Sequence, residues 1–324
     1  MFNNKKNSHL SIELNDYVLR AVLAKGPDIE QVQVFEVPLD KGIVEAATIL
    51  NEMELFSVFK EHVAKWGGKR QNVRIFVPDT SVLLRTFQHP QELESNQLKS
   101  YVEMELGLTI HLPFQDPLID VYDHVPGDGQ AVMYAAPSEE VSKMIGLLLD
   151  IRMQPEVADI RALSNVRLLE HMSLLDTSKT YLIADWSINE LSICIFSQGN
   201  VEFLRYQTIE TDMTKWHAKE DSDGELEFYY NGDLEEYRML VTDQVLEIDR
   251  MMNFFKFSLH KGEKAVDEIL IMGDNPLITK ITNLLSNNIT TPLTIVDDAI
   301  IQKHFPNISA KYASLLGLAL KEVH

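Results

Sequence analysis

The chain has 324 residues, of which 45% are apolar and 24% charged, a composition typical of a globular protein with about two domains. Its 49 acidic and 29 basic residues give a formal net charge of −20 at pH 7. That charge opposes sequence-independent binding to nucleic-acid phosphates or to an anionic lipid surface, because both need basic patches. No apolar run approaches the roughly 20 residues that cross a bilayer, and the polar N-terminus lacks the apolar stretch of a signal peptide. We therefore expect no nucleic-acid partner and no direct insertion into a membrane.

The single cysteine, Cys194, limits the chemistry that the chain can support. It cannot form an intrachain disulfide, and its place in the apolar run 191–196 predicts a buried core thiol rather than a nucleophile. Structural zinc sites need more cysteines, and the ten histidines show no pair at helical metal spacing. We expect no metal site, and a reducing cytosol as the environment of the protein.

The N-terminal part of the chain predicts the core of one lobe. Strand patterns at residues 10–14, 17–23 and 29–37 indicate an antiparallel meander. An amphipathic helix follows, marked by apolar residues at helical spacing: Leu55, Phe59, Val63 and Trp66. Residues 73–78 then predict the next strand of the same lobe.

A small α+β unit is predicted as an insertion at about residues 88–150. A polar helix is expected from about Gln91 to Leu106, followed by strands at 118–124 and 130–136 around a turn rich in glycine. A further helix is expected to open at Ser138, a good N-cap residue, and to run through Leu149. A helix predicted to start near Asp159 leads into the second lobe.

We place the first lobe at residues 1–179 and the second at 180–324. In the second lobe the acidic segment 220–236 predicts a solvated loop or hairpin, and its spacing does not fit a calcium loop. A long amphipathic helix with a buried apolar face is expected from about Tyr237. The closing helix at 311–323 is expected to pack back on the first lobe.

Three distant segments together predict an α/β fold of the actin-like, two-lobe type, with the α+β unit inserted in the first lobe. Ser8–Val22 and Tyr181–Tyr206 each contain an apolar strand, a polar turn and a second apolar strand, the hairpin that curls around nucleotide phosphates in this fold. Val266–Val296 contains a strand that ends in one glycine and a helix after it, where an adenosine would rest.

The residues expected at such a nucleotide site are Asn15, Asp185, Ser187 and Gly273. A triphosphate needs backbone N–H groups brought close by glycine and a metal held by carboxylates. Asn15 stands where glycine is expected, although asparagine can adopt the left-handed conformation that the turn would need. Asp185 is retained, whereas Ser187 occupies the second turn and a negative Asp274 follows Gly273. We expect a vestigial site with weak or absent binding of ATP and Mg²⁺, no cofactor, no catalytic residue and no useful hydrolysis.

Four further segments resemble the PilM family, the actin-like cytoplasmic components of type IV pilus assembly, which are similar to the cell-division protein FtsA. Glu103–Phe114 (EMELGLTIHLPF) resembles an acidic helix that ends in a Leu-Pro-Phe turn, and Met153–Leu163 (MQPEVADIRAL) resembles a segment with Val-Asp and Ala-Leu after a proline. Ile248–Phe257 (IDRMMNFFKF) is similar to a helix with paired aromatics, and Tyr312–Leu320 (YASLLGLAL) to the closing helix.

The resemblance implies a cytoplasmic adaptor of a type IV pilus-like complex. In the family, a groove on the first lobe captures the N-terminal tail of the bitopic membrane protein PilN, so the expected partners are a PilN-like tail and other assembly components. The expected location is peripheral to the inner face of the cell membrane. The alternatives are a nucleotide-dependent actin-like filament or FtsA-like protein and a sugar-kinase-like enzyme. FtsA is less favoured because its family ends in a membrane-binding helix, whereas this chain stops at residues 321–324.

Overall fold

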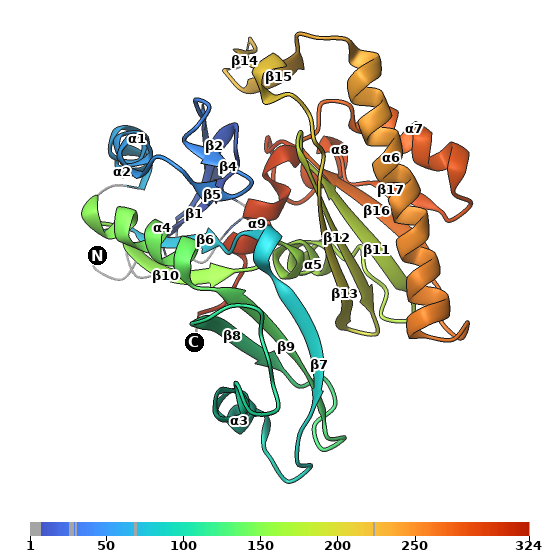
Figure 1. The fold of residues 1–324 in the computed structure, drawn as a ribbon. Helices are drawn as coiled ribbons and strands as arrows, with labels where there is room; N and C mark the ends of the chain where they lie inside the picture. The colour runs from blue at the N-terminus through green and yellow to red at the C-terminus, as the bar shows by residue number, and fades with distance from the viewer. Residues whose placement is uncertain (1–7, 26–28, 30, 68–69, 223, 324) are drawn as a thin grey trace.

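A computed structural model of the chain describes residues 8–25, 29, 31–67, 70–222 and 224–323, and two five-stranded sheets dominate it. Their strand orders are β10-β6-β1-β2-β3 and β13-β12-β11-β16-β17. Each sheet joins an antiparallel meander to parallel strands on the far side of the first strand of that meander. We call the elements around the first sheet the first lobe and those around the second sheet the second lobe (Figure 1).

The first sheet contains the predicted meander and two parallel strands. Its strands are β1 (His9–Leu14), β2 (Val18–Ala24), β3 (Val32–Pro38), β6 (Asn72–Phe76) and β10 (Gln154–Asp159). A short hairpin, β4 (Val44–Glu45) with β5 (Thr48–Ile49), follows β3. The sequence analysis did not predict β10, which contains Pro155 and lies at the edge of the sheet, where proline is tolerated.

The second sheet lies in the half of the chain where two strand–turn–strand blocks were predicted. Its strands are β11 (Thr180–Trp186), β12 (Glu190–Ser197), β13 (Asn200–Thr208), β16 (Glu268–Gly273) and β17 (Leu293–Ile295). Every residue of β11 is buried, as expected for a central strand covered on both faces. Cys194 on β12 is a buried free thiol, as predicted.

Two helices lie between the sheets and join the lobes into one core (Figure 1). They are α5 (Arg161–His171) and α9 (Ala313–Ala319), which pack against each other. All seven residues of α9 are buried, and the helix contacts β1, β2 and β16. The carbonyls at its C-terminal end accept hydrogen bonds from Arg74 of β6. The division at residues 179 and 180 stays a prediction.

The remaining helices cover the outer faces of the sheets. In the first lobe they are α1 (Glu52–Val58), α2 (Ala64–Gly67) and α4 (Glu139–Asp150), with a π-helical turn at Phe59–Val63 joining α1 to α2. In the second lobe they are α6 (Leu234–Asn253), continued by a π-helical turn at Phe254–Leu259, and α7 (Ile278–Asn288). The short α8 (Asp298–Ile301) instead contributes Ile301 to the core that contains α5 and α9. The acidic segment forms a hairpin of β14 (Trp216–Glu220) and β15 (Leu226–Tyr230).

A small subdomain extends from the first lobe and is formed by the part of the chain between β6 and β10 (Figure 1). It contains β7 (Leu83–Gln88), α3 (Leu98–Glu105), β8 (Pro117–Tyr122) and β9 (Gln130–Pro137), with strand order β7-β9-β8 and a core of its own. The helix expected from Gln91 begins only at Leu98, directly after a 3₁₀ turn at Ser95–Gln97 that a capping box between Glu94 and Gln97 starts. The strand β7 was not predicted, since four of its six residues are exposed.

Helix α4 follows the small sheet in sequence but packs against β10 and β5 of the main first-lobe sheet. Ser138 precedes α4 as predicted, yet its side chain makes no capping hydrogen bond; its backbone carbonyl accepts from the Ser142 N–H instead. Along the described ranges, none of the helices is long and apolar enough to span a membrane.

Gly317→Ala should destabilise the protein, because a Cβ at this position of α9 would lie 2.0 Å from the backbone oxygen of Ser164 in α5. Overpacking of this kind costs about 1–3 kcal/mol, so we expect the thermal midpoint to fall by a few degrees. The matched control is Gly146→Ala in α4, where a Cβ meets nothing within 4 Å and alanine favours the helix by about 1 kcal/mol. Equal midpoints for the two variants would contradict the close α5–α9 contact.

Candidate functional site

The predicted site residues Asn15, Asp185, Ser187 and Gly273 line one small space where the two lobes meet. Asn15 comes from the β1–β2 turn, Asp185 from the end of β11, Ser187 from the turn after it, and Gly273 from the end of β16. The fold therefore brings together the three segments that sequence analysis singled out. Buried charged side chains from both lobes share this space with them.

The β1–β2 turn forms without a left-handed residue. The backbone N–H of Asn15 donates to the Val18 carbonyl at 3.0 Å, and Asn15 is not among the residues with positive φ. The turn thus forms without glycine, and it does not use the left-handed conformation that asparagine can adopt. Asp16 ties the turn to the second lobe by accepting a hydrogen bond from Asn189 Nδ2 at 2.8 Å.

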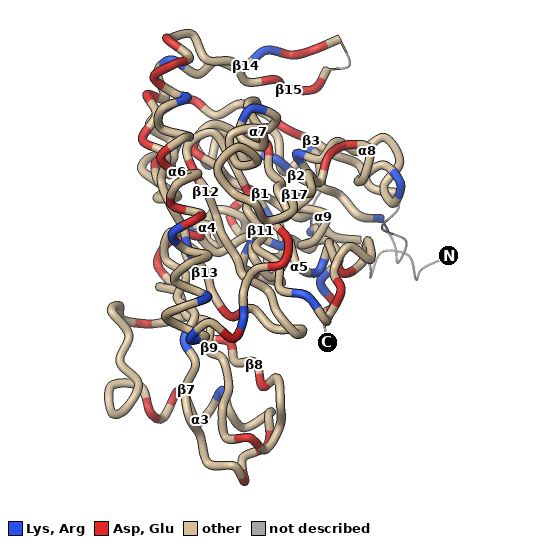
Figure 2. Tube along the Cα trace, turned by 90° about the vertical axis from the view of Figure 1, so that its right-hand side faces the viewer, with Lys and Arg blue, Asp and Glu red and all other residues tan. Residues whose placement is uncertain are grey.

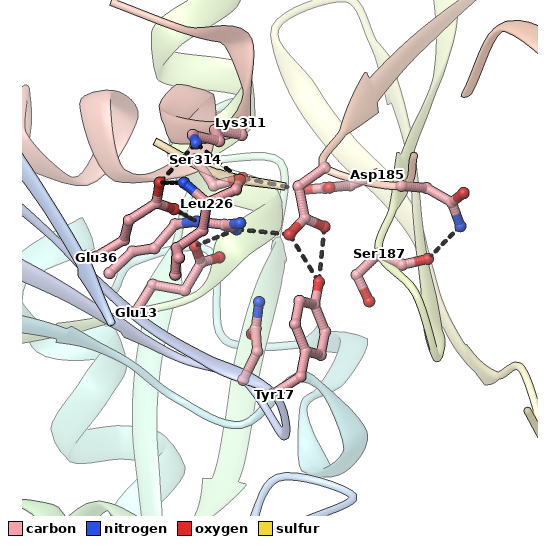
Figure 3. A network of polar contacts seen from close by, with 12 residues as sticks. Glu13, Tyr17, Glu36, Asp185, Ser187, Leu226, Lys311 and Ser314 are labelled. Carbon is pink, nitrogen blue, oxygen red and sulfur yellow. Dashed lines mark hydrogen bonds and ion pairs between the residues drawn. The ribbon is translucent and has the colours of Figure 1, made fainter. Parts of the chain in front are cut away.

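Arg20 and Asp274 form a buried ion pair between the lobes. Arg20, on β2, is 1% exposed, and its Nη1 lies 2.6 Å from Asp274 Oδ2, just beyond the end of β16. Its Nε donates to Glu36 of β3 at 3.1 Å. The Tyr17 hydroxyl donates to the same Asp274 carboxylate at 2.7 Å (Figure 3). Burial and the Asp274 charge raise the pKa of Tyr17, which keeps the phenol protonated as a donor.

Arg161, the first residue of α5, is the second buried cation. It pairs with Glu13 of β1, and its Nε lies 2.6 Å from Asp79 Oδ2 in the 3₁₀ turn after β6. Ser192 of β12 donates to the same Asp79 oxygen at 3.1 Å. Burial raises the pKa of Glu13, whereas Arg161 and Arg20 act to lower it. Arg161 therefore sits where carboxylates from three separate segments converge.

The Asp185 carboxylate accepts hydrogen bonds from other side chains of the protein. One of its carboxylate oxygens accepts from Asn165 Nδ2 of α5 and from Ser314 Oγ of α9, both at 2.8 Å. Burial raises the pKa of Asp185, opposed by the charge of Arg161. The Ser187 carbonyl accepts from Asn275 Nδ2 at 2.6 Å, and its buried Oγ has no partner among the described residues.

Gly273 is required by the contact between two strands. Its φ is +113°, and a Cβ would lie 2.1 Å from the backbone oxygen of Trp186 on the neighbouring strand β11. Any side chain at this position would therefore disturb the second sheet. The contact between β16 and β11 therefore explains the glycine at position 273 without any ligand.

The hairpin β14–β15 reaches across from the second lobe to the first (Figure 3). The backbone N–H of Leu226 donates to Glu36 Oε1 at 2.6 Å, and the Phe228 ring meets the Tyr17 ring edge-on at 4.9 Å. Lys311, which precedes α9, lies 2.6 Å from Glu36 Oε1 and 3.0 Å from Glu225 Oε2. The base of the hairpin stays on the second lobe, where Trp216 packs on Tyr237 of α6.

The sequence analysis missed the cations that fill this site: Arg20, Arg161 and Lys311. One signal was available, since Arg20 interrupts the apolar run of β2 while an unusual Asp274 follows Gly273. These side chains leave a volume of about 20 Å³ between the lobes, close to the room that one water needs. Within the described ranges, no group of three or more histidine, cysteine or acidic residues could hold a metal ion.

Comparisons with known proteins agree with this architecture. A solved structure described as the PilM-PilN type IV pilus biogenesis complex matches with a TM-score of 0.74 at 18% identity, covering 96% of this chain and 97% of that one. A Bacteroides thetaiotaomicron protein with an actin-like ATPase fold and unknown function matches with a TM-score of 0.52 at 13% identity, covering 99% and 100%. The ethanolamine utilization protein EutJ from Carboxydothermus hydrogenoformans matches with a TM-score of 0.52 at 8% identity, covering 97% and 89%. The predicted actin-like α/β fold is confirmed.

A search of curated protein sequences gives no significant match. The sequence model of the family described as type IV pilus assembly protein PilM matches residues 18–323, which is nearly the whole chain and includes the small subdomain and every strand of the two five-stranded sheets except β1. The resemblance inferred from the four segments is thereby confirmed. The chain belongs to the PilM family of type IV pilus assembly proteins.

Proposed function

We propose that this protein is an adaptor of pilus assembly whose lobes are held together by side chains instead of by a nucleotide. One observation carries this proposal. The space where the phosphates of ATP would lie contains the ion pairs of Arg20 with Asp274 and of Arg161 with Glu13. A site for a small molecule usually offers a cavity of about 300–1,000 Å³, whereas about 20 Å³ is left here.

Electrostatics also oppose a nucleotide. A triphosphate would have to enter beside the buried carboxylates of Glu13, Asp185 and Asp274. Displacing Arg20 or Arg161 from its partners would leave an uncompensated buried charge, which costs about 3–5 kcal/mol. The protein is therefore proposed to work without ATP, without Mg²⁺ and without enzymatic activity.

The first lobe offers a groove for the tail of a PilN-like membrane protein. A cavity of about 470 Å³ lies between the small subdomain and the end of β10. Its apolar walls include Leu118 and Ile119 of β8, Tyr134 of β9 and Leu163 of α5. Strand β8 is at the edge of its sheet, so an extended tail can add to it through backbone hydrogen bonds while its side chains enter the cavity.

Charge favours the encounter between such a tail and this protein. Cytoplasmic flanks of membrane spans are enriched in lysine and arginine, and this chain carries a net charge of −20. Acidic residues occur along the chain in both lobes (Figure 2), and Glu103 and Asp120 line the groove itself. We propose a cytoplasmic protein held at the inner face of the membrane by this tail, together with other assembly components.

Calorimetric titration with Mg-ATP should give no binding heat, because the phosphate positions are filled by buried ion pairs. The control is the same titration with the nonhydrolysable analogue, which excludes heat from turnover. Micromolar affinity would refute the nucleotide-free proposal. In that case Asp185→Ala should weaken binding if the carboxylate contacts the metal. Gly273→Val, in contrast, would not report on the adenosine, since any Cβ there clashes with β11.

A synthetic peptide of the N-terminal tail of the PilN-like partner should bind, more weakly at high than at low ionic strength. Leu118→Lys should weaken binding about tenfold or more, since it removes an apolar wall of the groove and repels a basic tail. Tyr122→Lys is the control, adding the same charge to β8 outside the groove. No binding at either salt concentration would remove the adaptor proposal, whereas tight binding without salt dependence would remove only the electrostatic part.

Stability should fall as pH rises above 5, because burial raises the pKa of Glu190 to about 8 from its usual 4.5. The folded state then binds a proton that the unfolded state has lost. This contribution is fully present below pH 4.5 and is lost as pH rises through 8, with an upper bound on the order of several kcal/mol.

Glu190→Gln should flatten the decline in the free energy of unfolding between pH 5 and 9, measured by denaturant titration at each pH. Glu13 and Asp185 add to the same slope, since burial raises the pKa of both carboxyls. For this reason the variant should reduce the slope and not abolish it. The control is the exposed Glu263→Gln, which should leave the slope unchanged. A variant with the full wild-type slope would show that Glu190 is ionised in the folded protein.

A further inference from the structure

We infer that the tail-binding groove continues into a second cavity between the two lobes, so that a bound tail contacts both lobes. This inference rests on the proposed function, because it concerns the same tail. The second cavity has a volume of about 250 Å³. It is lined by Asp79 and Ser192 and lies between the segment that leads into β7 and the strands β12 and β13. Ser192 also lines the space that holds Arg20.

The two cavities share a wall. Two residues line both the groove of the first lobe and the second cavity: Val82, which directly precedes β7, and Ile160, which directly precedes α5. Beyond them, the walls of the second cavity come from the second lobe and include Ile183 of β11 and Leu204 of β13. A chain that leaves the groove past Val82 therefore meets apolar side chains of the second lobe.

The residues that line the second cavity include one with a buried hydrogen-bond acceptor that has no partner among the described residues. Asn165 of α5 is 2% exposed and lines the cavity. Its Nδ2 donates to Asp185, while its Oδ1 has no partner within the described part of the chain. Leaving a buried acceptor unpaired costs about 1–3 kcal/mol, so a ligand that supplies an N–H group gains from pairing with it.

An extended peptide satisfies these features together. Its backbone supplies N–H donors, and its alternate side chains supply apolar groups for the walls formed by Ile183 and Leu204. Strand β13 is the edge of the second sheet, as β8 is the edge of the small sheet, so each cavity lies beside a strand edge that can accept a peptide. Water alone would pair with Asn165 but would not cover the apolar walls.

The affinity for a tail that contacts both lobes depends on how the lobes are arranged. Binding that depends on one lobe position stabilises that position by the same free energy, because linkage is reciprocal. The lobe arrangement is set here by the contacts of Arg20 and of Glu36. Tail affinity and these interlobe contacts are therefore coupled, although the contacts lie outside both cavities.

The test compares a full-length tail peptide with peptides shortened stepwise from each end, titrated into the intact protein. Leu204→Lys removes an apolar wall and adds a charge that repels a basic tail. It should weaken the full peptide about tenfold or more, and the effect should vanish for the peptide that lacks the residues filling the second cavity. Thr208→Lys is the control, since it adds the same charge to an exposed position of β13 outside the cavity.

The outcomes separate this inference from the proposed function. If Leu204→Lys binds the full tail as Thr208→Lys does, while Leu118→Lys loses affinity, the tail occupies only the first groove and the inference is overturned. If the wild-type protein binds no tail peptide, the proposed function fails first. Should Leu204→Lys unfold, a photo-crosslinking residue at position 204 decides, because it attaches to the full tail only if the second cavity is occupied.

Discussion

The ion pair of Arg20 with Asp274 is the contact on which the arrangement of the lobes depends. It joins strand β2 of the first sheet to the end of β16 of the second, at 2.6 Å and out of contact with water. Burying two charges costs several kcal/mol for each ion, which is repaid only when hydrogen bonds satisfy them. Here Glu36 accepts a hydrogen bond from Arg20, and Tyr17 donates one to Asp274. Separating the lobes would expose or orphan these groups, so the closed arrangement is favoured.

The same contacts place the cavities of the protein. Helices α5 and α9 lie between the sheets, and the side chains at their starts, Arg161 and Ser314, reach into the interlobe site. These side chains fill the interlobe site. The groove of the first lobe and the second cavity lie along the segment from Val77 to Leu83, which leads into the small subdomain. Hairpin β14–β15 adds a bridge on the opposite side through Leu226.

The sequence predicted the strand pairs and the lost phosphate loops, because both depend on local patterns. It did not predict the buried ion pair between the lobes, since Arg20 and Asp274 are 254 positions apart and one arginine in a strand looks like an outward-facing residue. The strands β7 and β10 were missed for a related reason. Both are edge strands, so they lack a continuous apolar run, and Pro155 further weakens the pattern. The shared space of Asn15, Asp185, Ser187 and Gly273 followed from topology alone.

In the proposed function, side chains take the place of a nucleotide between the lobes, and this changes how such a fold can take part in an assembly. A two-lobe protein that closes on a nucleotide changes shape when the nucleotide is absent, whereas lobes joined by Arg20 and Asp274 are closed as soon as the chain has folded. A partner that spans both lobes then meets surfaces already in place and loses less free energy in ordering them. Strong preorganisation suits an adaptor that must hold a short tail, because few contacts are available to offset the entropy of binding.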